Sequence, residues 1–306
     1  MGNMTRGVDE LIESFGIPKL STTPHGYKGC CTINHNHIDS SPSMHIHIEK
    51  GLVKCFSCGA FKPLFSFLLD NGATFDEAIE FLFLDHYADR EVSGELTEYI
   101  LGRKFPKSFI DRGFTKETLK HFSVGFDEVE RRTTIPLRYP HKGKLFGVQY
   151  RAYPKKFWAT EGFNKDNFIY NFEPTSIRYY VEGFTDTWRT WQNGTKNVSA
   201  TLSANPSVGQ LEIMKQHDEI RIAFDNDVAG LRGAFAIHEA LGREVEISMI
   251  PYNAKDPGDC TKSVWEKGLD SMMSFTEFEV NLINKNRKLY EEIKNGTSRG
   301  NNSIGY

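Results

Sequence analysis

Residues 219–241 read EIRIAFDNDVAGLRGAFAIHEAL, in which a short apolar run leads through an acidic loop into an amphipathic segment. Residues 219–224 predict a strand, because β-branched and aromatic side chains dominate them. Residues 229–241 predict a helix, because apolar side chains recur every three or four positions. A strand followed by a helix of this length is the repeating unit of a parallel α/β sheet.

The same alternation continues on both sides of this stretch. Residues 178–181 and 197–201 predict upstream strands, each followed by a helical segment, and residues 245–250 predict a downstream strand. The second half of the chain is therefore expected to form a parallel α/β domain.

The first half of the chain has a mixed pattern. Residues 44–49 alternate between apolar and polar side chains, which predicts a strand, and residues 52–55 predict its hairpin partner. Residues 84–97 are charged and poor in large aliphatic side chains, so we expect a linker there. Helices are expected at residues 8–15, 60–69, 74–83 and, in short pieces, 98–122, and further strands between residues 131 and 172. This half is therefore expected to be α+β in a multidomain chain.

Acidic side chains follow three of the predicted strands directly: Glu182, Asp225, Asp227, Asp256 and Asp259. The carboxyl ends of parallel strands share one edge of a sheet, and ligands bind at that edge. Like charges gathered there are unfavourable without a cation, and carboxylate oxygens suit Mg²⁺ or Mn²⁺. Such ions can stabilise the attacking and leaving oxygens in nucleotidyl transfer.

Each of these acids also has an ordinary structural interpretation. The sequence Asp225-Asn226-Asp227 can cap the helix that follows it, and the sequence from Asp256 to Asp259 can form a turn. Taken together at successive strand ends, the acids favour a metal site.

Residues 29–58 hold four of the five cysteines and four of the ten histidines. The pair Cys55 and Cys58 at the end of the predicted hairpin is typical of half of a tetrahedral zinc site. Either Cys30 or Cys31 would supply a third ligand, and either His35 or His37 the fourth. A redox CxxC pair normally opens a helix in a thioredoxin-like unit and would leave the upstream residues unexplained.

Two further histidines in this stretch, His45 and His47, alternate with the apolar side chains of the predicted strand. We expect them on its polar outer face.

Residues 131–160 contain eight Lys or Arg residues and no Asp or Glu, although the net charge of the chain is −3. A local field of this kind can attract a polyanion even when the chain as a whole is acidic. The alternative is a solvated surface, but ordinary surfaces intersperse both signs of charge.

The bulk composition excludes several classes of protein. With 306 residues and 39% hydrophobic residues, the chain should fold into two or three globular domains. No apolar run approaches the ~20 residues of a membrane span, and the N-terminus lacks the apolar region of a signal peptide. Five cysteines, four of them clustered with histidines, indicate a metal site in a reducing compartment. We expect a cytoplasmic protein, in the host cytoplasm if it is viral.

The acidic segments carry a family resemblance. Val181–Asp186 (VEGFTD), Phe224–Gly230 (FDNDVAG) and Lys255–Pro257 (KDP) resemble the three motifs of a Toprim domain. That domain occurs in topoisomerases, some nucleases and bacterial-type primases.

The first half of the chain selects among these families. Residues 27–31 (YKGCC), 41–44 (SPSM) and 54–59 (KCFSCG) resemble the zinc-binding domain of bacterial and phage DnaG-type primases. Residues 134–138 (TIPLR), 146–151 (FGVQYR) and the pair Lys155-Lys156 resemble the basic subdomain that precedes Toprim in those enzymes. The likeness runs in the family's domain order from about residue 7 to 265.

The resemblance implies a zinc-ribbon-like β-hairpin module, a mixed α+β basic subdomain and a parallel Toprim α/β sheet. The implied ranges are a zinc-binding domain at 1–92, a basic subdomain at 98–175, a Toprim domain at 176–265, and a C-terminal helix with a disordered tail at 266–306. The implied zinc ligands are Cys31, His37, Cys55 and Cys58.

Two positions depart from the family pattern. Five residues separate Cys31 from His37, where the family usually has two, so Cys30 and His35 stay alternatives. Gly258 stands where the family often has a second Asp in the third motif, which leaves the role of the following Asp259 open.

The implied reaction is template-directed synthesis of a short RNA primer from ribonucleoside triphosphates on single-stranded DNA. Asp225, Asp227 and Asp256, with Glu182, would hold Mg²⁺ or Mn²⁺ ions, and Glu182 is alternatively a general base. The role of Asp186 stays open between orienting these groups and binding a further ion. The implied template- or triphosphate-binding residues are Arg138, Arg151, Lys155 and Lys156, with Tyr153, Phe157 and Trp158 as candidates for base stacking.

The remaining expectations concern partners. The chain ends near residue 306, which is short for a helicase-binding domain, and it lacks the GxxxxGK[ST] pattern of a fused helicase. We therefore expect a phage-type or minimal primase that is a monomer by itself and works with a separate helicase. The alternatives are a Toprim nuclease that acts on DNA and a non-catalytic replisome adaptor that binds single strands.

Overall fold

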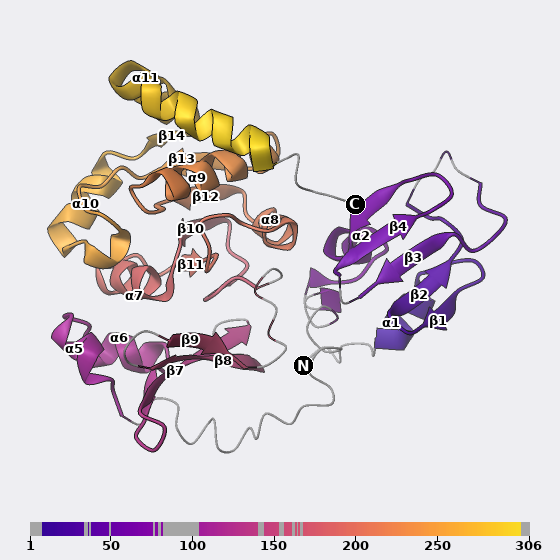
Figure 1. Cartoon of the computed structure of the whole chain (residues 1–306), viewed down its shortest axis with the longest axis horizontal. Helices are drawn as coiled ribbons and strands as arrows, with labels where there is room; N and C mark the ends of the chain where they lie inside the picture. The colour runs from indigo at the N-terminus through magenta and orange to yellow at the C-terminus, as the bar shows by residue number, and fades with distance from the viewer. Residues whose placement is uncertain are drawn as a thin grey trace. The chain divides into compact units, whose positions relative to one another are not determined.

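The chain divides into two compact units, residues 1–91 and 92–306, which are described separately (Figure 1). The structure is a computed structural model. It describes residues 8–33, 36, 38–48, 50–75, 77–78, 81, 104–139, 144–152, 156–160, 163, 165 and 168–300.

Unit 1 is built on one antiparallel sheet with the strand order β1-β2-β3-β4-β5. Its elements are α1 (Val8–Ser14), β1 (Ser21–Thr23), β2 (Gly26–Gly29), β3 (Met44–His47), β4 (Leu52–Cys55), β5 (Phe61–Pro63) and α2 (Leu64–Asp70). Alternate side chains of the three central strands are buried, among them Tyr27, Met44 and Val53. The strand periodicity and the hairpin predicted for residues 44–55 are thus present.

The helix predicted at residues 60–69 begins later than expected. Residues 61–63 instead form β5, which pairs with β4 from Leu52 to Lys54. Pro63 has extended backbone angles and stands at the N-cap of α2, so the helix starts at Leu64. Within the predicted helix at 74–83, residues 74, 75, 77, 78 and 81 are described, and all of them except Thr74 are helical. The predicted linker lies outside the described residues.

Unit 2 begins with two short helices and a four-stranded antiparallel sheet in the order β6-β7-β8-β9. These elements are α5 (Lys107–Asp111), α6 (Lys116–His121), β6 (Gly125–Asp127), β7 (Arg132–Tyr139), β8 (Lys144–Ala152) and β9 (Lys156–Ala159). The hydroxyl of Thr115 accepts a hydrogen bond from the backbone N–H of Thr118 and caps α6.

The rest of unit 2 is an α/β sheet with the strand order β11-β10-β12-β13-β14. Its elements are β10 (Ile177–Val181), α7 (Phe184–Gln192), β11 (Val198–Ala200), α8 (Val208–Met214), β12 (Glu219–Ile222), α9 (Val228–Leu241), β13 (Glu246–Met249), the 3₁₀ helix η2 (Pro257–Asp259), α10 (Lys262–Asp270), β14 (Met273–Ser274) and α11 (Phe275–Gly300). The first four strands in this order are parallel, and β14 is antiparallel to β13. The predicted parallel sheet is thus present, with one added antiparallel edge strand of two residues, which is too short to show periodicity in the sequence.

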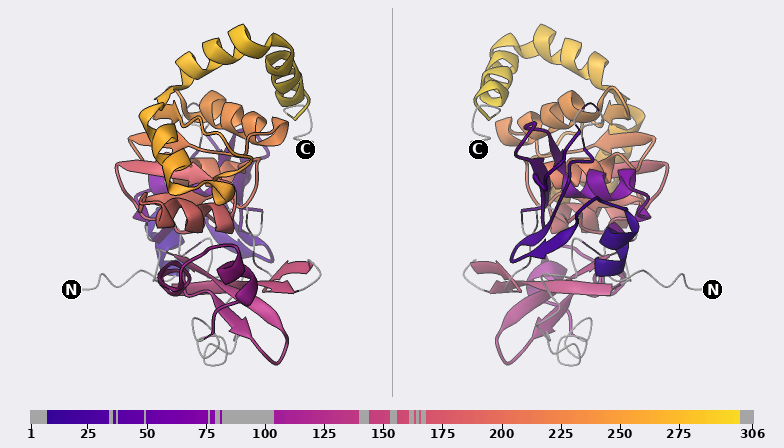
Figure 2. Two further views of the ribbon diagram at one scale, coloured as in Figure 1. Left: turned by 90° about the vertical axis from the view of Figure 1, so that its left-hand side faces the viewer. Right: turned by 90° about the vertical axis from the view of Figure 1, so that its right-hand side faces the viewer.

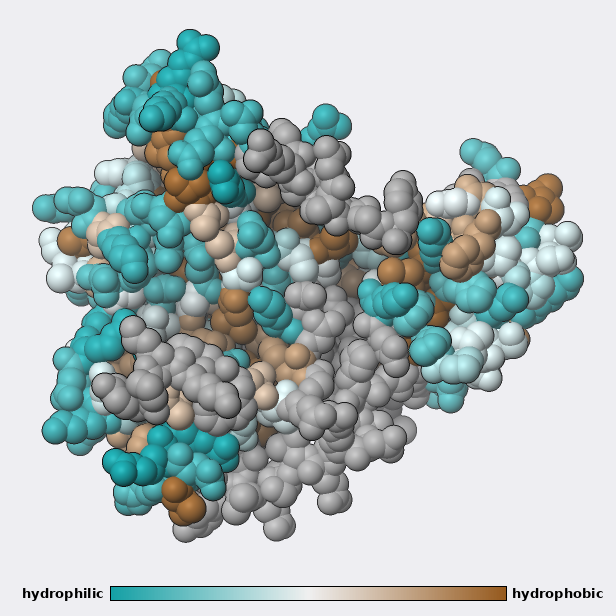
Figure 3. Space-filling model, in the orientation of Figure 1, coloured by the Kyte–Doolittle hydropathy of each residue, from teal (hydrophilic) through white to brown (hydrophobic). Residues whose placement is uncertain are grey.

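Helix α11 packs on α9 and changes direction at Asn286, and Figure 2 shows the bend. Figure 3 shows its outer surface as predominantly hydrophilic. The expectation of a disordered tail is wrong for residues 295–300, which continue the helix, while residues 301–306 lie outside the described ranges. Within those ranges, none of the helices combines the length and the apolarity that a membrane span requires.

Candidate functional site

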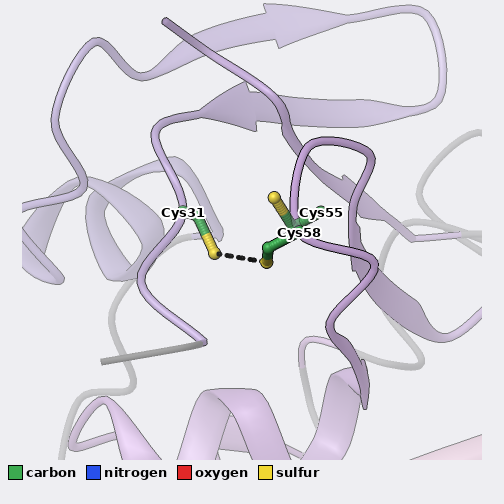
Figure 4. Close-up of side chains that lie close together, drawn as sticks. All are labelled: Cys31, Cys55 and Cys58. Carbon is green, nitrogen blue, oxygen red and sulfur yellow. Dashed lines mark hydrogen bonds between the residues drawn. The ribbon is translucent and has the colours of Figure 1, made fainter. Parts of the chain in front are cut away.

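Three cysteine sulfurs meet in unit 1, where Cys31, Cys55 and Cys58 have all their Sγ atoms within 4.8 Å of one another (Figure 4). Among the residues that the structure describes, they form the one group of three or more potential metal ligands at this spacing. Cys55 ends β4 and Cys58 lies in the following turn, while Cys31 comes two residues after β2. Cys30 is buried outside the group, and both His35 and His37 lie outside the described residues.

Hydrogen bonds around the three sulfurs favour a thiolate. The carboxylate of Asp39 accepts from the backbone N–H of Cys31 (2.9 Å) and from the hydroxyl of Ser43 (2.5 Å). That hydroxyl also lies 3.1 Å from the sulfur of Cys55. Burial opposes ionisation of Cys55, but its contact with the Ser43 hydroxyl and hydrogen bonds from the backbone of Cys58 and Ser57 lower its pKa to about 6. A thiolate is the form that ligates zinc, so the donor set fits a structural zinc ion.

Sequence reasoning passed over Asp39. Its only local signal is an Asp in a loop between candidate ligands, which is an ordinary turn residue. Its hydrogen bonds to Cys31 and Ser43 become visible only once β2 and β4 are placed on either side of β3.

The carboxylates of unit 2 follow three neighbouring parallel strands. Glu182 follows β10, Asp225 and Asp227 follow β12, and Asp256 follows β13. The strands are adjacent in the order β10-β12-β13 and point the same way, so these residues lie at one edge of the sheet.

Hydrogen bonds join these segments to one another and to the following helices. The Glu182 carboxylate accepts from the backbone N–H of Asp225 (3.0 Å). Asp227 caps α9 through the N–H of Gly230 (2.9 Å), and Asp256 caps η2 through the N–H of Asp259 (3.0 Å). Asp227 and Asp256 therefore cap helices and also lie at the sheet edge that the carboxylates share. The side chain of Asp259 is exposed.

Burial and mutual repulsion raise the pKa values of two carboxylates at this edge of the sheet. Burial and the neighbouring carboxylate of Asp225 raise the pKa of Glu182 to about 7. Burial, with the carboxylates of Asp256 and Asp227, raises the pKa of Asp225 to about 6. One carboxylate oxygen of Asp225, Oδ1, is buried without a hydrogen-bond partner. A divalent cation would relieve both the repulsion and the unpaired oxygen, so the residues fit Mg²⁺ or Mn²⁺.

Asp186, whose role the sequence left open, is buried and ties two segments together. Its carboxylate accepts from the backbone N–H groups of Gly183 (2.8 Å) and Gly258 (3.0 Å). Burial and the charges of Asp225 and Asp256 raise its pKa to about 7. Asp186 therefore links the segment after β10 to the segment after β13.

Gly230 is a further residue that sequence reasoning missed. A Cβ at this position would lie 2.6 Å from a carboxylate oxygen of Glu182 and 2.3 Å from the carbonyl oxygen of Asp225. Only glycine lets the first turn of α9 approach the carboxylates this closely.

The predicted cationic residues fall on the antiparallel sheet of unit 2. Arg138 lies on β7 and Arg151 on β8, whereas Lys155 and the side chain of Lys156 lie outside what the structure describes. Arg151 lines a cavity of about 210 Å³ together with Gly183 and Thr185, the residues that follow Glu182. Arg151 thus lies across this cavity from the segment that follows Glu182, and the cavity is otherwise lined by apolar side chains.

The positive charges of Arg151 and Arg112 repel one another. Burial lowers the pKa of Arg151, and the positive charge of Arg112 lowers it further. An anion such as a phosphate would offset this repulsion. The side chains of Tyr153, Phe157 and Trp158, expected to stack on bases, are outside the described set.

Known protein families match two ranges of residues in this chain. Residues 6–96 match the CHC2 zinc finger family, and residues 179–261 match the Toprim-like family. The first of these matches is to the zinc ribbon of DnaG-type proteins. The DnaG-type zinc ribbon and the three-sulfur cluster together support a structural zinc site in unit 1.

Relatives of this chain are bacterial DNA primases. The chain is 24% identical to the DNA primase of Clostridium acetobutylicum, an alignment that covers 87% of this chain and 56% of that protein. It is 25% identical to the DNA primase of Geobacillus stearothermophilus, over 83% of this chain and 56% of that protein. The chain therefore spans about half the length of the curated relatives it matches.

The fold agrees with these relationships. The Aquifex aeolicus primase structure, which contains zinc-binding and RNA polymerase domains, matches with a TM-score of 0.54 at 18% identity, covering 95% of this chain and 91% of that one. A DnaG primase catalytic domain bound to single-stranded DNA matches with a TM-score of 0.51, at 18% identity over 62% of this chain and 80% of that chain. The expected architecture of zinc-binding module, basic subdomain and Toprim sheet is confirmed.

Proposed function

We propose that this chain is a DNA primase, which synthesises short RNA primers on single-stranded DNA by nucleotidyl transfer that depends on a divalent metal. One observation carries the proposal: acidic groups that follow three neighbouring parallel strands share one sheet edge, where burial and neighbouring carboxylates raise the pKa values of Glu182 and Asp225. A divalent cation relieves such repulsion, and two-metal sites built from carboxylates catalyse phosphoryl and nucleotidyl transfer.

In this proposal Asp225, Asp227, Asp256 and Glu182 hold the metal ions. When bound, the ions supply a lowered pKa for the attacking 3′-hydroxyl and charge neutralisation for the leaving pyrophosphate. Glu182 is either a ligand or the general base, and a pKa of about 7 suits a base that works near neutral pH. The buried carboxyl of Asp186 orients the segments that carry the ligands.

The cationic sheet of unit 2 would bind phosphates. Arg151 and Arg138 offer guanidinium groups that contact phosphate oxygens in pairs, and Lys155 and Lys156 add charge beside them. The cavity between Arg151 and the segment after Glu182 supports the binding of a triphosphate or of template backbone next to the metals.

Unit 1 would contact the template through the outer face of its sheet. Strand register places Lys28, His45, Lys54 and Phe61 side by side across β2, β3, β4 and β5. Phe56, which is 67% exposed, packs its ring edge-to-face with His45 and lies 5.5 Å from the Lys54 ammonium. Cations interleaved with exposed aromatic rings suit single-stranded nucleic acid, whose phosphates and bases they bind.

One assay tests this function against the alternatives. The full chain is incubated with single-stranded DNA, labelled ribonucleoside triphosphates and Mg²⁺, and the products are separated on a gel. Labelled oligomers that depend on the DNA support the primase. Shortened DNA without labelled oligomers would mean a Toprim nuclease, and DNA binding without either product would mean an adaptor. The variant Asp225→Asn is the matched negative control.

The remaining expectations on partners belong to the same proposal. Primer synthesis would occur in the cytoplasm, or the host cytoplasm if the protein is viral, together with a separate replicative helicase. Pull-down of the full chain with candidate hexameric helicases, followed by primer synthesis with and without the captured helicase, tests this point.

A further inference from the structure

The loop that carries Asp256 leaves β13 at Met249 and enters η2 after Asp256. Its first part is tied to the end of β12 by Asn226, whose backbone N–H donates to the carbonyl of Lys255 (2.9 Å) and whose side-chain amide donates to the carbonyls of Tyr252 (2.9 Å) and Ala254 (2.7 Å). Asp256 follows these anchored residues and is the N-cap of η2, so the position of its carboxylate also depends on what holds η2.

Helix α7 holds η2 at Gly258 from two sides. The N–H of Gly258 donates to Asp186 (3.0 Å), and its carbonyl accepts from the Nε of Arg189 (3.1 Å). Asp186 and Arg189 are three residues apart, so they lie on one face of α7. A Cβ at Gly258 would lie 2.7 Å from Asp186 Oδ1, so glycine is required for this approach.

The rest of the Arg189 guanidinium reaches the other part of unit 2. Its Nη1 donates to the carbonyl of Gly113 (3.2 Å) and its Nη2 to the carbonyl of Arg112 (2.6 Å). These carbonyls follow the end of α5, where helical carbonyls lack partners within the helix. The guanidinium also lies 4.4 Å from the centre of the Phe114 ring.

All three nitrogens of Arg189 therefore donate to backbone carbonyls, one on the Asp256 loop and two beside α5. Lysine cannot reproduce this, because an ammonium lacks the planar fork of donors. Arg189 itself touches none of the proposed metal ligands.

We infer that Arg189 is a positioning residue that sets the divalent-metal affinity of the carboxylate site by fixing the Asp256 loop against α7 and α5. This inference rests on the proposed function, because it assigns Arg189 a part in the same metal site. Groups that orient metal ligands typically contribute about 10- to 100-fold in metal affinity or activity.

The test compares Arg189→Lys with the wild type in the full, zinc-containing chain. Binding of Mn²⁺ is followed by the electron paramagnetic resonance signal of free Mn²⁺, and primer synthesis is measured as a function of Mg²⁺. We expect the Mn²⁺ Kd to rise roughly ten-fold or more, with a similar rise in the Mg²⁺ concentration for half-maximal synthesis. The rate at saturating Mg²⁺ should approach that of the wild type.

The matched control is Arg221→Lys. Arg221 is also partly buried and hydrogen-bonded, but its guanidinium donates to Glu219 and Tyr179 and to none of the carboxylates of the site. It should leave the Mn²⁺ Kd unchanged. Equal weakening in both variants would overturn the inference, because it would indicate a general loss of structure.

A second variant approaches the same contact from the loop. Gly258→Ala places a methyl group against Asp186 and should weaken Mn²⁺ binding as well. The double variant should be less impaired than the product of the two single effects, because both changes disrupt one contact. Independent, multiplicative effects would overturn the inference.

The result for the wild type separates the inference from the proposed function. An unchanged Mn²⁺ Kd in Arg189→Lys, with metal-dependent synthesis in both proteins, would overturn the inference alone. A wild type that binds no Mn²⁺ and makes no primers would overturn the proposed function, and this inference with it.

Discussion

At the scale of single residues, the carboxylate of Asp225 is the clearest example of repulsion between like charges in this site. It stands among Asp256, Asp227 and Glu182, and one of its oxygens has no hydrogen-bond partner. A group arranged in this way destabilises the metal-free fold and is stabilised by a cation. The same residue therefore links stability to metal binding.

The first prediction concerns Asp225→Asn. Because the folded-state pKa of Asp225 is raised from 3.8 to about 6, its contribution to stability is present below pH 4 and is lost as the pH rises through 6. Without Mg²⁺, the variant should therefore exceed the wild type in stability at pH 8, by on the order of 1 kcal/mol, and differ little at pH 4. Urea unfolding of both proteins at the two pH values measures this.

The same variant should lose the response to metal. Mg²⁺ should raise the melting temperature of the wild type at pH 8 and leave that of Asp225→Asn nearly unchanged. Primer synthesis should fall by at least about 100-fold, since the variant removes a charged ligand. A wild-type level of synthesis in the variant would refute the metal assignment.

A second residue-scale prediction concerns Cys55. Cys55→Ser should release about one zinc ion per chain, because the hydroxyl is a far weaker ligand than the thiolate. Zinc content is measured by atomic absorption. The buried Cys260→Ser is the control, because its sulfur lies in unit 2, far along the chain from the cluster, and should leave the zinc content unchanged. Undiminished zinc in Cys55→Ser would exclude this residue as a ligand.

At the scale of elements, one face of the unit 1 sheet packs into the core and the other face is available for binding. Tyr27, Met44 and Val53 pack inward, while Lys28, His45 and Lys54 alternate with them on the outer face. Mutations on the outer face should therefore change binding with little effect on folding.

The prediction at this scale is made for Phe56→Ala. Loss of the exposed ring should weaken binding of single-stranded DNA by about 1–3 kcal/mol, the usual contribution of a stacked base. Fluorescence anisotropy with a labelled oligonucleotide at fixed salt gives the affinity, and thermal melting should change little. Val280→Ala, at a 51% exposed site on α11, is the control. Equal affinities for Phe56→Ala and the wild type would exclude stacking at this position.

At the scale of the whole molecule, the two units have separate cores and separate metal chemistry. The cysteine cluster lies wholly in unit 1 and the carboxylates wholly in unit 2. Zinc binding contributes directly to the folding of small zinc domains. Removal of zinc should therefore affect one unit only.

This gives the prediction for metal removal. After treatment with a zinc chelator, hydrogen exchange should accelerate within residues 26–58 and stay unchanged in β10, β12 and β13. Mass spectrometry of the exchanged peptides measures both regions in one sample, and readdition of zinc should restore protection. Acceleration in both units would contradict independent cores.

Several features of this protein follow from the sequence alone. The alternation of strands and helices after residue 177 and the hairpin ending at Cys55 are present as expected. These features depend on side-chain periodicity and on neighbours a few residues apart, so local patterns carry them. The start of α2 and the antiparallel strand β14 could not be predicted from the sequence, because pairing with other strands of the sheet determines both.

The detail of both sites depended on the tertiary structure. Strand register, and not spacing, brought Cys31 rather than Cys30 beside Cys55 and Cys58, and it placed Asp39 behind them. Packing of α7 against η2 gave Asp186 and Arg189 their common partner, Gly258, more than sixty residues away in the chain. The sequence by itself thus determined which chemical groups are available and which strand ends carry them. Only the tertiary structure decided which of these groups touch, because contacts between distant segments are set by how the elements pack and not by any local pattern.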